Sequence, residues 1–223
     1  MMIEALDGVL PPRARVLDLG CGTGSLSERV LDRFPRVKVV AIDRDPLLLA
    51  IGRAALGDRG GRLTWVDADL RAPDWPRGLP RGRFDAAVTS TAMHWLTSPE
   101  LARLYRALGR RIRPGGIFLN ADSIRTRRRY PRLRRILERG ARRRNARLPG
   151  AVGDSWSDWW TSALHEPGLA EEAALHRSRF PRSHHGTRTA DLAGHERSLR
   201  RAGFREVAVI WSRGRSRVLA AVR

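Results

Sequence analysis

The chain has 223 residues, of which 42% are hydrophobic, and it carries a formal net charge of +20. This length suits one α/β domain, residues 1–223, with enough apolar content to bury a core. No apolar run approaches the roughly 20 residues of a membrane span, and the N-terminal MMIEALDGVLPPRARV lacks the regions of an export signal. The single cysteine, Cys21, excludes an internal disulfide and a multi-cysteine metal site. We therefore expect a soluble cytoplasmic protein that has no membrane partner and no metal site.

The positive charge raises the question of nucleic-acid binding, because basic surfaces bind phosphate backbones. Lys38 is the only lysine among 43 basic residues, and such a bias toward arginine is typical of the codon usage of a GC-rich genome. Much of the charge therefore reflects composition. Binding to nucleic acid is kept as the less favoured interpretation.

Strand-like and helix-like patterns alternate from residue 15 to residue 121. Short apolar or β-branched runs predict strands, and apolar residues at helical spacing predict helices. The predicted strands are Arg15–Leu19, Val37–Ile42, Leu63–Val66, Phe84–Thr89 and Ile117–Ala121, and the predicted helices are Ser25–Phe34, Pro46–Leu56 and Pro99–Ile112. This alternation predicts a doubly wound parallel sheet, in which ligands bind at the carboxyl ends of the strands.

Residues 123–190 interrupt this rhythm and are predicted to form a helical insertion after the fifth strand. A helix over Leu192–Ala202 follows, and the strands Glu206–Trp211 and Arg217–Val222 are predicted to form an antiparallel hairpin at the sheet edge. Within the insertion, twelve of the 23 residues of 125–147 are arginine. We interpret this segment as a helix whose basic face is either solvated or a landing surface for an acidic partner.

A second part of the insertion, DSWSDWW over residues 154–160, contains three tryptophans. These rings can form an aromatic wall that attracts a cation, or they can be the small core that anchors the insertion on the sheet. The second interpretation is favoured.

The glycine-rich stretch VLDLGCGTG joins the first predicted strand to the first predicted helix. Gly20, Gly22 and Gly24 alternate in it, and Asp18 lies two residues before the first glycine. Dinucleotide sites need a different glycine spacing, and phosphate-binding loops need a lysine that is absent here. A carboxylate beside the loop favours a positively charged ligand. Asp43, at the end of the second strand, is placed to accept hydrogen bonds from a ribose, while Asp45 suits the N-cap of the following helix.

The chain resembles the class I S-adenosylmethionine-dependent methyltransferases in the order of several motifs. These are VLDLGCGTG, VVAIDRD with Asp43, VDADL with Asp69 and Leu70, FDAAVTSTAMHWL, LGRRIRPGGIFL, and the closing AGFREVAVIW and SRVLAAVR. MHWL is similar to the trans-aconitate methyltransferase branch. The resemblance implies a Rossmann-like seven-stranded sheet with an antiparallel C-terminal strand, and S-adenosyl-L-methionine as the cofactor.

The resemblance also implies a role for each motif residue. The loop glycines lie against the methionine part of the cofactor, Asp18 lies near its ammonium group, and Asp43 accepts hydrogen bonds from the ribose. Asp69 and the Leu70 amide bind the adenine, Ser90 faces the methyl group, and Arg44 either lies along the adenine or is solvated.

His94, four residues after Ser90, is the candidate catalytic base. Its alternative role is to pack at the start of the next helix and shape the pocket, which is the role expected of Trp95. His184 and His185 are a second candidate pair, interpreted as loop surface. Because the donor methyl is already activated, alignment of the reactants can supply most of the catalysis.

Two functions remain open. In the favoured one, the protein methylates a small molecule and the insertion covers the substrate as a lid. In the other, it methylates RNA or protein and docks through the arginine-rich face. The acceptor atom and the oligomeric state are not predicted.

Overall fold

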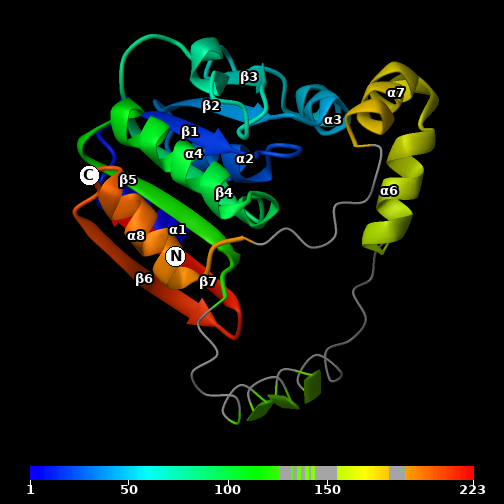
Figure 1. Cartoon of the computed structure of the whole chain (residues 1–223). Coiled ribbons are helices and arrows are strands. Elements are labelled where there is room, and N and C mark those ends of the chain that lie inside the picture. Colours follow the sequence, from blue (N-terminus) through cyan, green and yellow to red (C-terminus); the bar gives the residue numbers. More distant parts are fainter. Residues whose placement is uncertain (126–131, 133–134, 137–138, 141, 144–154, 181–188) are drawn as a thin grey trace.

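The structure, a computed structural model, describes residues 1–125, 132, 135–136, 139–140, 142–143, 155–180 and 189–223. One sheet of seven strands, in the order β3-β2-β1-β4-β5-β7-β6, forms its centre (Figure 1). The strands are β1 (Arg15–Leu19), β2 (Lys38–Asp43), β3 (Leu63–Asp67), β4 (Phe84–Ser90), β5 (Ile112–Ser123), β6 (Glu206–Arg213) and β7 (Ser216–Val222). β7 runs antiparallel to both β5 and β6, while the first five strands are parallel. The predicted sheet with its antiparallel C-terminal strand is confirmed.

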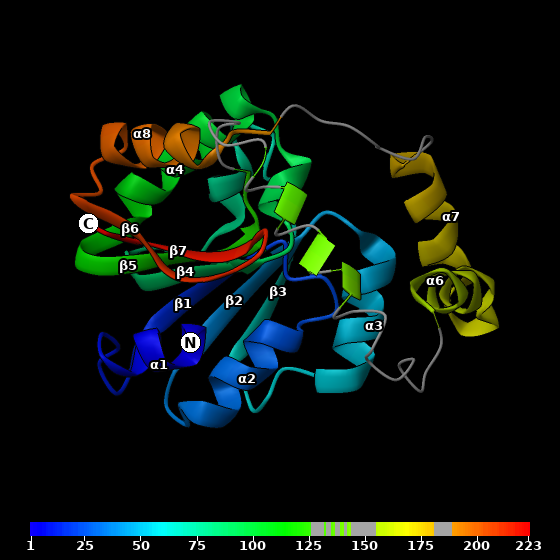
Figure 2. The ribbon, with the colours of Figure 1, turned by 90° about the horizontal axis from the view of Figure 1, so that it is seen from below.

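Helices cover both faces of the sheet, as Figure 2 shows. One face carries α4 (Ser98–Arg111) and α8 (Leu192–Arg201), and the other carries α1 (Met2–Asp7), α2 (Ser25–Arg33) and α3 (Pro46–Leu56). α6 (Trp156–His165) and α7 (Ala170–Arg179) follow β5 and stand beyond the end of the sheet next to α3. Short 3₁₀ turns lie at η1 (Trp75–Gly78), η2 (Met93–Trp95) and η3 (Pro167–Leu169). Among the described residues of the insertion, the helices α6 and α7 therefore follow the fifth strand, as predicted for a helical insertion.

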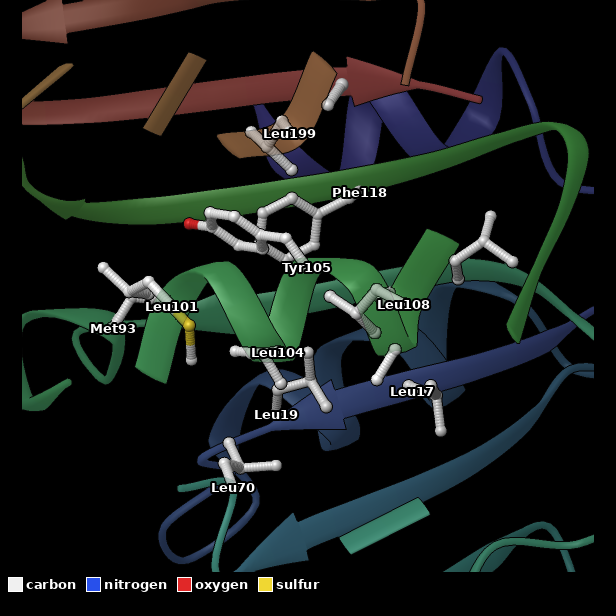
Figure 3. Close-up of a cluster of buried hydrophobic side chains, with 14 of the residues drawn as sticks. Leu17, Leu19, Leu70, Met93, Leu101, Leu104, Tyr105, Leu108, Phe118 and Leu199 are labelled. Carbon is white, nitrogen blue, oxygen red and sulfur yellow. The ribbon is translucent and has the colours of Figure 1, made fainter. Parts of the chain in front are cut away.

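Two apolar cores lie on the two faces of the sheet. The first packs Leu17 and Leu19 of β1 and Phe118 of β5 against Tyr105 of α4 and Leu199 of α8 (Figure 3). The second packs alternate residues of the same strands against α1, α2 and α3. Both faces of β1 are buried, and its apolar residues Val16, Leu17 and Leu19 pack on both sides of the sheet, which is typical of a central parallel strand.

The helix starts follow local capping chemistry. The side chain of Asp45 accepts hydrogen bonds from the backbone N–H groups of Leu47 and Leu48, and Pro46 occupies the first turn of α3. The N-cap role inferred for Asp45 is therefore confirmed. α4 begins one residue before its predicted start, with a capping box between Thr97 and Glu100.

The structure differs from the sequence prediction mainly at strand ends. β5 begins at Ile112 instead of Ile117, because the chain pairs with β4 on both sides of a bulge that contains Pro114, Gly115 and Gly116. β6 and β7 are longer than predicted and leave only Gly214 and Arg215 as their turn. α1 was not predicted, since its six residues are too few for a clear periodicity.

The strand order places the binding crevice. β1 pairs with β2 on one side and with β4 on the other, so the order of the strands reverses beside β1. Ligands of open α/β sheets bind at the carboxyl ends of the strands at such a point. No helix in the part of the chain that the structure describes is long and apolar enough to cross a membrane.

Candidate active site

A cavity of about 1580 Å³ opens at the carboxyl ends of β1, β2 and β4 and extends to α6 and α7. Its walls include most of the residues that the sequence predicted for the site: Asp18, Gly20, Gly22, Asp43, Arg44, Asp69, Leu70, Ser90 and His94. Gly24 is the exception and does not line the cavity. Pockets for one small ligand occupy about 300 to 1,000 Å³, so the cavity has room for two molecules.

The three loop glycines have different structural roles. All three have positive φ angles, of 66°, 56° and 86° in chain order, which favour glycine over other residues. A Cβ on Gly24 would lie 2.6 Å from the ring of Trp65, whereas a Cβ on Gly22 would meet nothing closer than 3.9 Å. Gly24 therefore lets α2 approach β3, and Gly22 leaves space on the cavity side.

Asp18 is buried in β1 and accepts a hydrogen bond from the hydroxyl of Ser27 at 2.7 Å. Burial raises the pKa of its carboxyl to about 7, although the bond from Ser27 acts in the opposite direction. Taking a carboxylate out of water is costly when no cation compensates its charge. A positively charged ligand in the cavity would supply that compensation.

Asp43 connects the glycine loop to the start of α3. Its two oxygens accept the backbone N–H groups of Gly22, at 2.8 Å, and Asp45, at 2.9 Å. Burial raises the pKa of this carboxyl as well, against the effect of these two amides. Each carboxylate oxygen can accept a further hydrogen bond, so Asp43 can hold the loop and still accept ribose hydroxyls.

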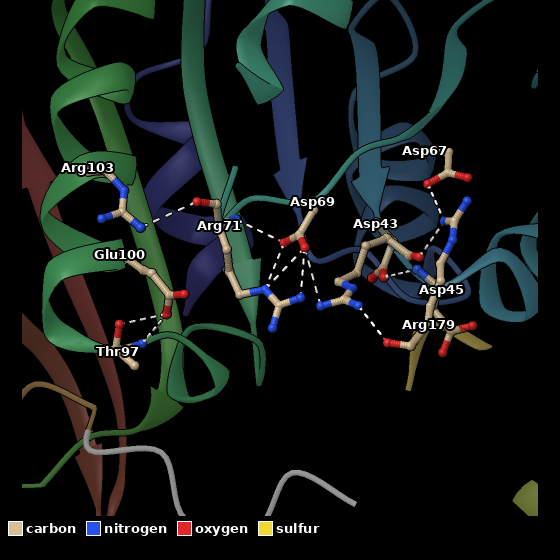
Figure 4. Close-up of polar contacts among 10 residues, drawn as sticks. Asp43, Asp45, Asp67, Asp69, Arg71, Thr97, Glu100, Arg103 and Arg179 are labelled. Atoms are coloured by element: carbon tan, nitrogen blue, oxygen red, sulfur yellow. Dashed lines mark hydrogen bonds and ion pairs between the residues drawn. The ribbon is translucent and has the colours of Figure 1, made fainter. Parts of the chain in front are cut away.

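Asp69 lies between two guanidinium groups, as Figure 4 shows. Arg71 donates to both oxygens of Asp69 at 2.8 to 3.1 Å, and Arg44 lies 3.3 Å away. Burial raises the pKa of the Asp69 carboxyl, while the charge of Arg44 lowers it. An adenine amino group would share this carboxylate with the two arginines.

Arg44 has a position that the sequence did not predict. Its guanidinium lies over the ring of Phe180 at 4.4 Å, and its Nη2 donates to the carbonyl oxygen of Arg179. In return, Nη1 of Arg179 donates to the carbonyl oxygen of Arg44 and to the carboxylate of Asp67 (Figure 4). Together with His176, whose Nδ1 lies 2.8 Å from Asp45, these contacts attach the C-terminal end of α7 to the ends of β2 and β3. We call this set of contacts the α7 clamp.

His94 forms a dyad with Asp122 at the opposite side of the cavity. The Nδ1 atom of His94 lies 2.8 Å from one oxygen of Asp122, and the backbone N–H of His94 donates to the other oxygen at 3.0 Å. Asp122 also accepts the N–H of Ser123 and is almost fully buried, while the His94 side chain is 34% exposed. A carboxylate on Nδ1 orients an imidazole and directs its proton-accepting role to Nε2.

A strained residue joins Ser90 to this dyad. Thr91 has a φ angle of 53°, a left-handed conformation that is rare for a β-branched residue and concentrates at functional sites. The bend it makes is fixed by the N–H of Thr91, which donates to the carbonyl of Ala121 on β5 at 2.8 Å. The chain after β4 is thereby turned so that Ser90, His94 and Trp95 all line the cavity.

The tryptophans of α6 do not form a buried core, so that interpretation is wrong. No residue of α6 is buried, and Trp156 is 74% exposed. Trp156 stacks on Trp159 at 5.6 Å with an interplanar angle of 10°, and Trp160 meets both rings edge-on. All three line the cavity. Trp95, which the sequence predicts to pack at the start of the next helix and to shape the pocket, is 50% exposed and lines the cavity.

Some functional residues could not be found from the sequence. Asp122 is 28 residues from His94 and looks like part of an ordinary strand, and Phe180 is 136 residues from Arg44. Only the fold brings these pairs together. His184 and His185 lie outside the described residues, and so does most of the arginine-rich segment 125–147.

Comparisons with known proteins agree with this geometry. A family model for a methyltransferase domain matches residues 16–116. Trans-aconitate 2-methyltransferase from Azoarcus sp. (strain BH72) is 36% identical over 108 residues, which are 48% of this chain and 38% of that protein. Malonyl-[acyl-carrier protein] O-methyltransferase from Anoxybacillus flavithermus (strain DSM 21510 / WK1) is 27% identical over 92 residues, which are 41% of this chain and 33% of that protein. The chain spans less than half the length of these curated relatives.

Among solved structures, an O-methyltransferase family protein from Burkholderia thailandensis has a TM-score of 0.62 at 20% identity, covering 100% of this chain and 55% of that chain. Human N-acetylserotonin methyltransferase, in complex with SAM, has a TM-score of 0.56 at 14% identity and covers 94% of this chain and 47% of that chain. At these identities the likeness establishes the fold. Residues 16–116 therefore match a methyltransferase domain, and the chain has the fold of the class I S-adenosylmethionine-dependent methyltransferases.

Proposed function

We propose that this protein transfers the methyl group of S-adenosylmethionine to a hydroxyl oxygen of a small-molecule acceptor. The observation that carries the proposal is the composition of the cavity. Three acidic residues suited to the cofactor, Asp18, Asp43 and Asp69, line the same cavity as the oriented histidine of the His94–Asp122 dyad.

The residues at the ends of β1, β2 and β3 fit the cofactor in charge and space. The buried carboxyl of Asp18 suits the ammonium end, and Asp43 suits the ribose hydroxyls beside the open side of Gly22. Asp69 and the backbone of Leu70 suit the adenine. When bound, S-adenosylmethionine supplies a methyl group on a positively charged sulfur, and the carbon–sulfur bond breaks with its electron pair remaining on sulfur.

His94 moves the proton in the proposed reaction. Its Nε2 accepts the proton of the acceptor hydroxyl while the hydroxyl oxygen forms its bond to the methyl carbon. The products are a methyl ether and S-adenosylhomocysteine, and His94 later returns the proton to water. A base placed in this way accelerates a reaction by about 10²- to 10⁴-fold, and alignment of the two reactants contributes on the order of 7 to 11 kcal/mol.

Asp122 acts through His94 as a positioning residue. Its two oxygens hold both the ring and the backbone of His94, and burial keeps competing water away from the carboxylate. The carboxylate stabilises the imidazolium that forms when His94 takes up the proton.

We further propose that residues 123–190 form a lid on a single domain that comprises residues 1–223. The α7 clamp supports this assignment, since it holds α6 and α7 against the cofactor side of the cavity. A small acceptor would then enter between α6 and the chain segment that carries His94.

Methyl transfer from labelled S-adenosylmethionine tests the proposal. The purified protein is offered a set of low-molecular-weight alcohols and phenols, and in separate reactions total RNA and an acyl carrier protein. We expect the labelled methyl group in a small molecule, with S-adenosylhomocysteine formed in equal amount. Label found only in RNA or in protein would contradict the proposal and favour docking through the arginine-rich segment instead.

A further inference from the structure

The cavity wall is divided by charge into two sides. Every lining aspartate and arginine in the described part of the chain comes from residues 18–71: Asp18, Arg29, Asp43, Arg44, Asp45, Asp69 and Arg71. We call this the donor side. The lining residues of segments 1–3, 90–96, 121, 156–180 and 211–218 include no aspartate, glutamate, lysine or arginine, and the N-terminal ammonium of Met1 pairs with Glu4 at 3.3 Å. We call these segments the acceptor side.

The acceptor side is rich in exposed aromatic rings. Trp95, Trp156 and Trp211 are all among the exposed large hydrophobic residues of the described chain, and all three line the cavity. Trp159, Trp160 and Phe180 line it too. Soluble proteins rarely leave several large apolar side chains exposed in one place, and such a patch often marks a ligand-binding groove or another interaction site. Their position around a single cavity points to a ligand that buries them.

The rings on α6 and α7 form a continuous series that ends at the donor side. Trp159 contacts Trp160 at 5.2 Å between ring centroids, Trp160 contacts His176 at 5.1 Å, and His176 stacks on Phe180 at 4.9 Å. The α7 clamp then fixes Phe180 under Arg44. The wall is therefore held in place before an acceptor binds, and a flat face is offered to it by the stacked pair Trp156 and Trp159.

We infer that the acceptor is an uncharged planar aromatic compound that carries a phenolic hydroxyl, and that its ring packs against the tryptophans of α6. The inference rests on the proposed function and names its substrate class. Aromatic rings prefer stacked or edge-on partners, which the wall supplies. A phenolic proton, with a pKa near that of tyrosine at about 10, is within the reach of a histidine base.

The charge division argues against an acidic acceptor. A polycarboxylate such as the trans-aconitate named for some relatives needs guanidinium or ammonium partners when it is buried. Within the described residues, the arginines at the cavity lie on the donor side, and two of them, Arg44 and Arg71, are paired with Asp69. A cationic acceptor would lack a carboxylate partner on the acceptor side, since Asp122 already holds His94.

Calorimetric titration of the protein saturated with S-adenosylhomocysteine tests this inference. The probes are 2-naphthol, its saturated counterpart 2-decalol, trans-aconitate and choline. We expect 2-naphthol to bind about three- to tenfold more tightly than 2-decalol because of ring stacking, and more tightly than either charged probe. Equal binding of the aromatic and saturated probes, or tighter binding of trans-aconitate or choline, would overturn the inference.

Variants locate the binding surface. We expect Trp156→Ala and Trp159→Ala each to remove most of the preference for 2-naphthol over 2-decalol. Leu175→Ala is the matched control, because Leu175 is 48% exposed on α7 but does not line the cavity. An unchanged preference in both tryptophan variants would overturn the inference. Failure of S-adenosylhomocysteine itself to bind would overturn the proposed function too, so the two failures are distinguishable.

Discussion

The donor side of the cavity is built by loops that directly follow β1, β2 and β3, whereas much of the acceptor side is built by α6 and α7, far along the chain. On the donor side, acidic residues are held by neighbours close in sequence, as Asp43 is by the amides of Gly22 and Asp45. On the acceptor side, the rings of α6 and α7 depend on the α7 clamp, whose contacts span more than 100 residues.

This difference explains what the chain shares with its relatives. The matched family model ends at residue 116 and so contains the whole donor side but neither α6 nor α7. The donor side thus lies inside the segment that matches a methyltransferase domain, while α6 and α7 of the acceptor side lie outside the match. Changes on the acceptor side should alter turnover and acceptor affinity, and changes on the donor side should alter cofactor binding and stability.

The largest effect is expected from removing the base on the acceptor side. His94→Gln should lower kcat for methylation of a phenolic acceptor by about 10²- to 10⁴-fold, because the proton loses its acceptor. The affinity for S-adenosylhomocysteine, measured by calorimetry, should stay the same. His165→Gln is the control, since His165 is exposed on α6 and does not line the cavity. A kcat of His94→Gln within a factor of three of the parent value would contradict the role of His94 as the catalytic base.

On the donor side, Asp18→Asn should change the pH dependence of stability. Burial raises the pKa of Asp18 from its ordinary value of 3.8 to about 7 in the folded protein, so the folded state binds more protons between these values. Stability is therefore lost as the pH rises through about 7. Relative to the variant, the parent's free energy of unfolding should fall by about 3 kcal/mol between pH 5 and pH 8.

Urea denaturation of the two proteins without ligand measures this difference. His195, whose pKa burial lowers to about 4, is present in both proteins and cancels in the comparison. Asp74→Asn, at an exposed position outside the cavity, serves as the control. Parallel stability curves for the parent and Asp18→Asn would show that Asp18 has no special environment.

The α7 clamp connects the donor side to the acceptor side. Phe180→Ala should affect acceptor binding more than cofactor binding. Loss of the ring removes the cation–π contact with Arg44 and the stack on His176. We expect the KM for a phenolic acceptor to rise about three- to tenfold, with a smaller change in the dissociation constant of S-adenosylhomocysteine. Steady-state kinetics and calorimetry measure the two quantities, with Leu175→Ala as the control. A larger effect on the cofactor than on the acceptor would reverse the roles given to the two sides.

The smallest effect is expected at the strained bend after β4. Thr91→Gly should raise the free energy of unfolding by about 1 kcal/mol, because glycine adopts a positive φ without strain. It should also lower kcat, since the segment that carries His94 becomes less rigid. Arg59→Gly is its counterpart for kcat, with a φ of 52° in a loop outside the cavity, although it also removes the ion pair of Arg59 with Asp32. The kcat of Arg59→Gly should stay at the parent value, and a loss of kcat in this variant as well would show that the effect is not specific to the site.

The sequence predicted which residues line the donor side, except Gly24, because the signals there are local. The run VVAID ends in Asp43, and Asp45 followed by Pro46 marks the start of α3. Most contacts of the acceptor side could not be predicted from the sequence, because they join residues that are distant in the chain. The pairing of His94 with Asp122 and the position of Arg44 over Phe180 leave no local sequence pattern. Three tryptophans close together in the sequence are compatible with a buried hydrophobic core and with an exposed aromatic wall alike. The φ of Thr91 is likewise set by its bond to Ala121 on the neighbouring strand.

The central claim is that the donor side binds S-adenosylmethionine through its acidic residues. Isothermal titration of S-adenosylmethionine into the parent, Asp43→Ala and Asp74→Ala tests it most directly. Two hydrogen bonds to a charged acceptor are worth about 3 kcal/mol together, so Asp43→Ala should weaken binding about 100-fold. Asp43→Asn should weaken it less and Asp74→Ala not at all. No binding by the parent, or equal binding by the parent and Asp43→Ala, would contradict the account.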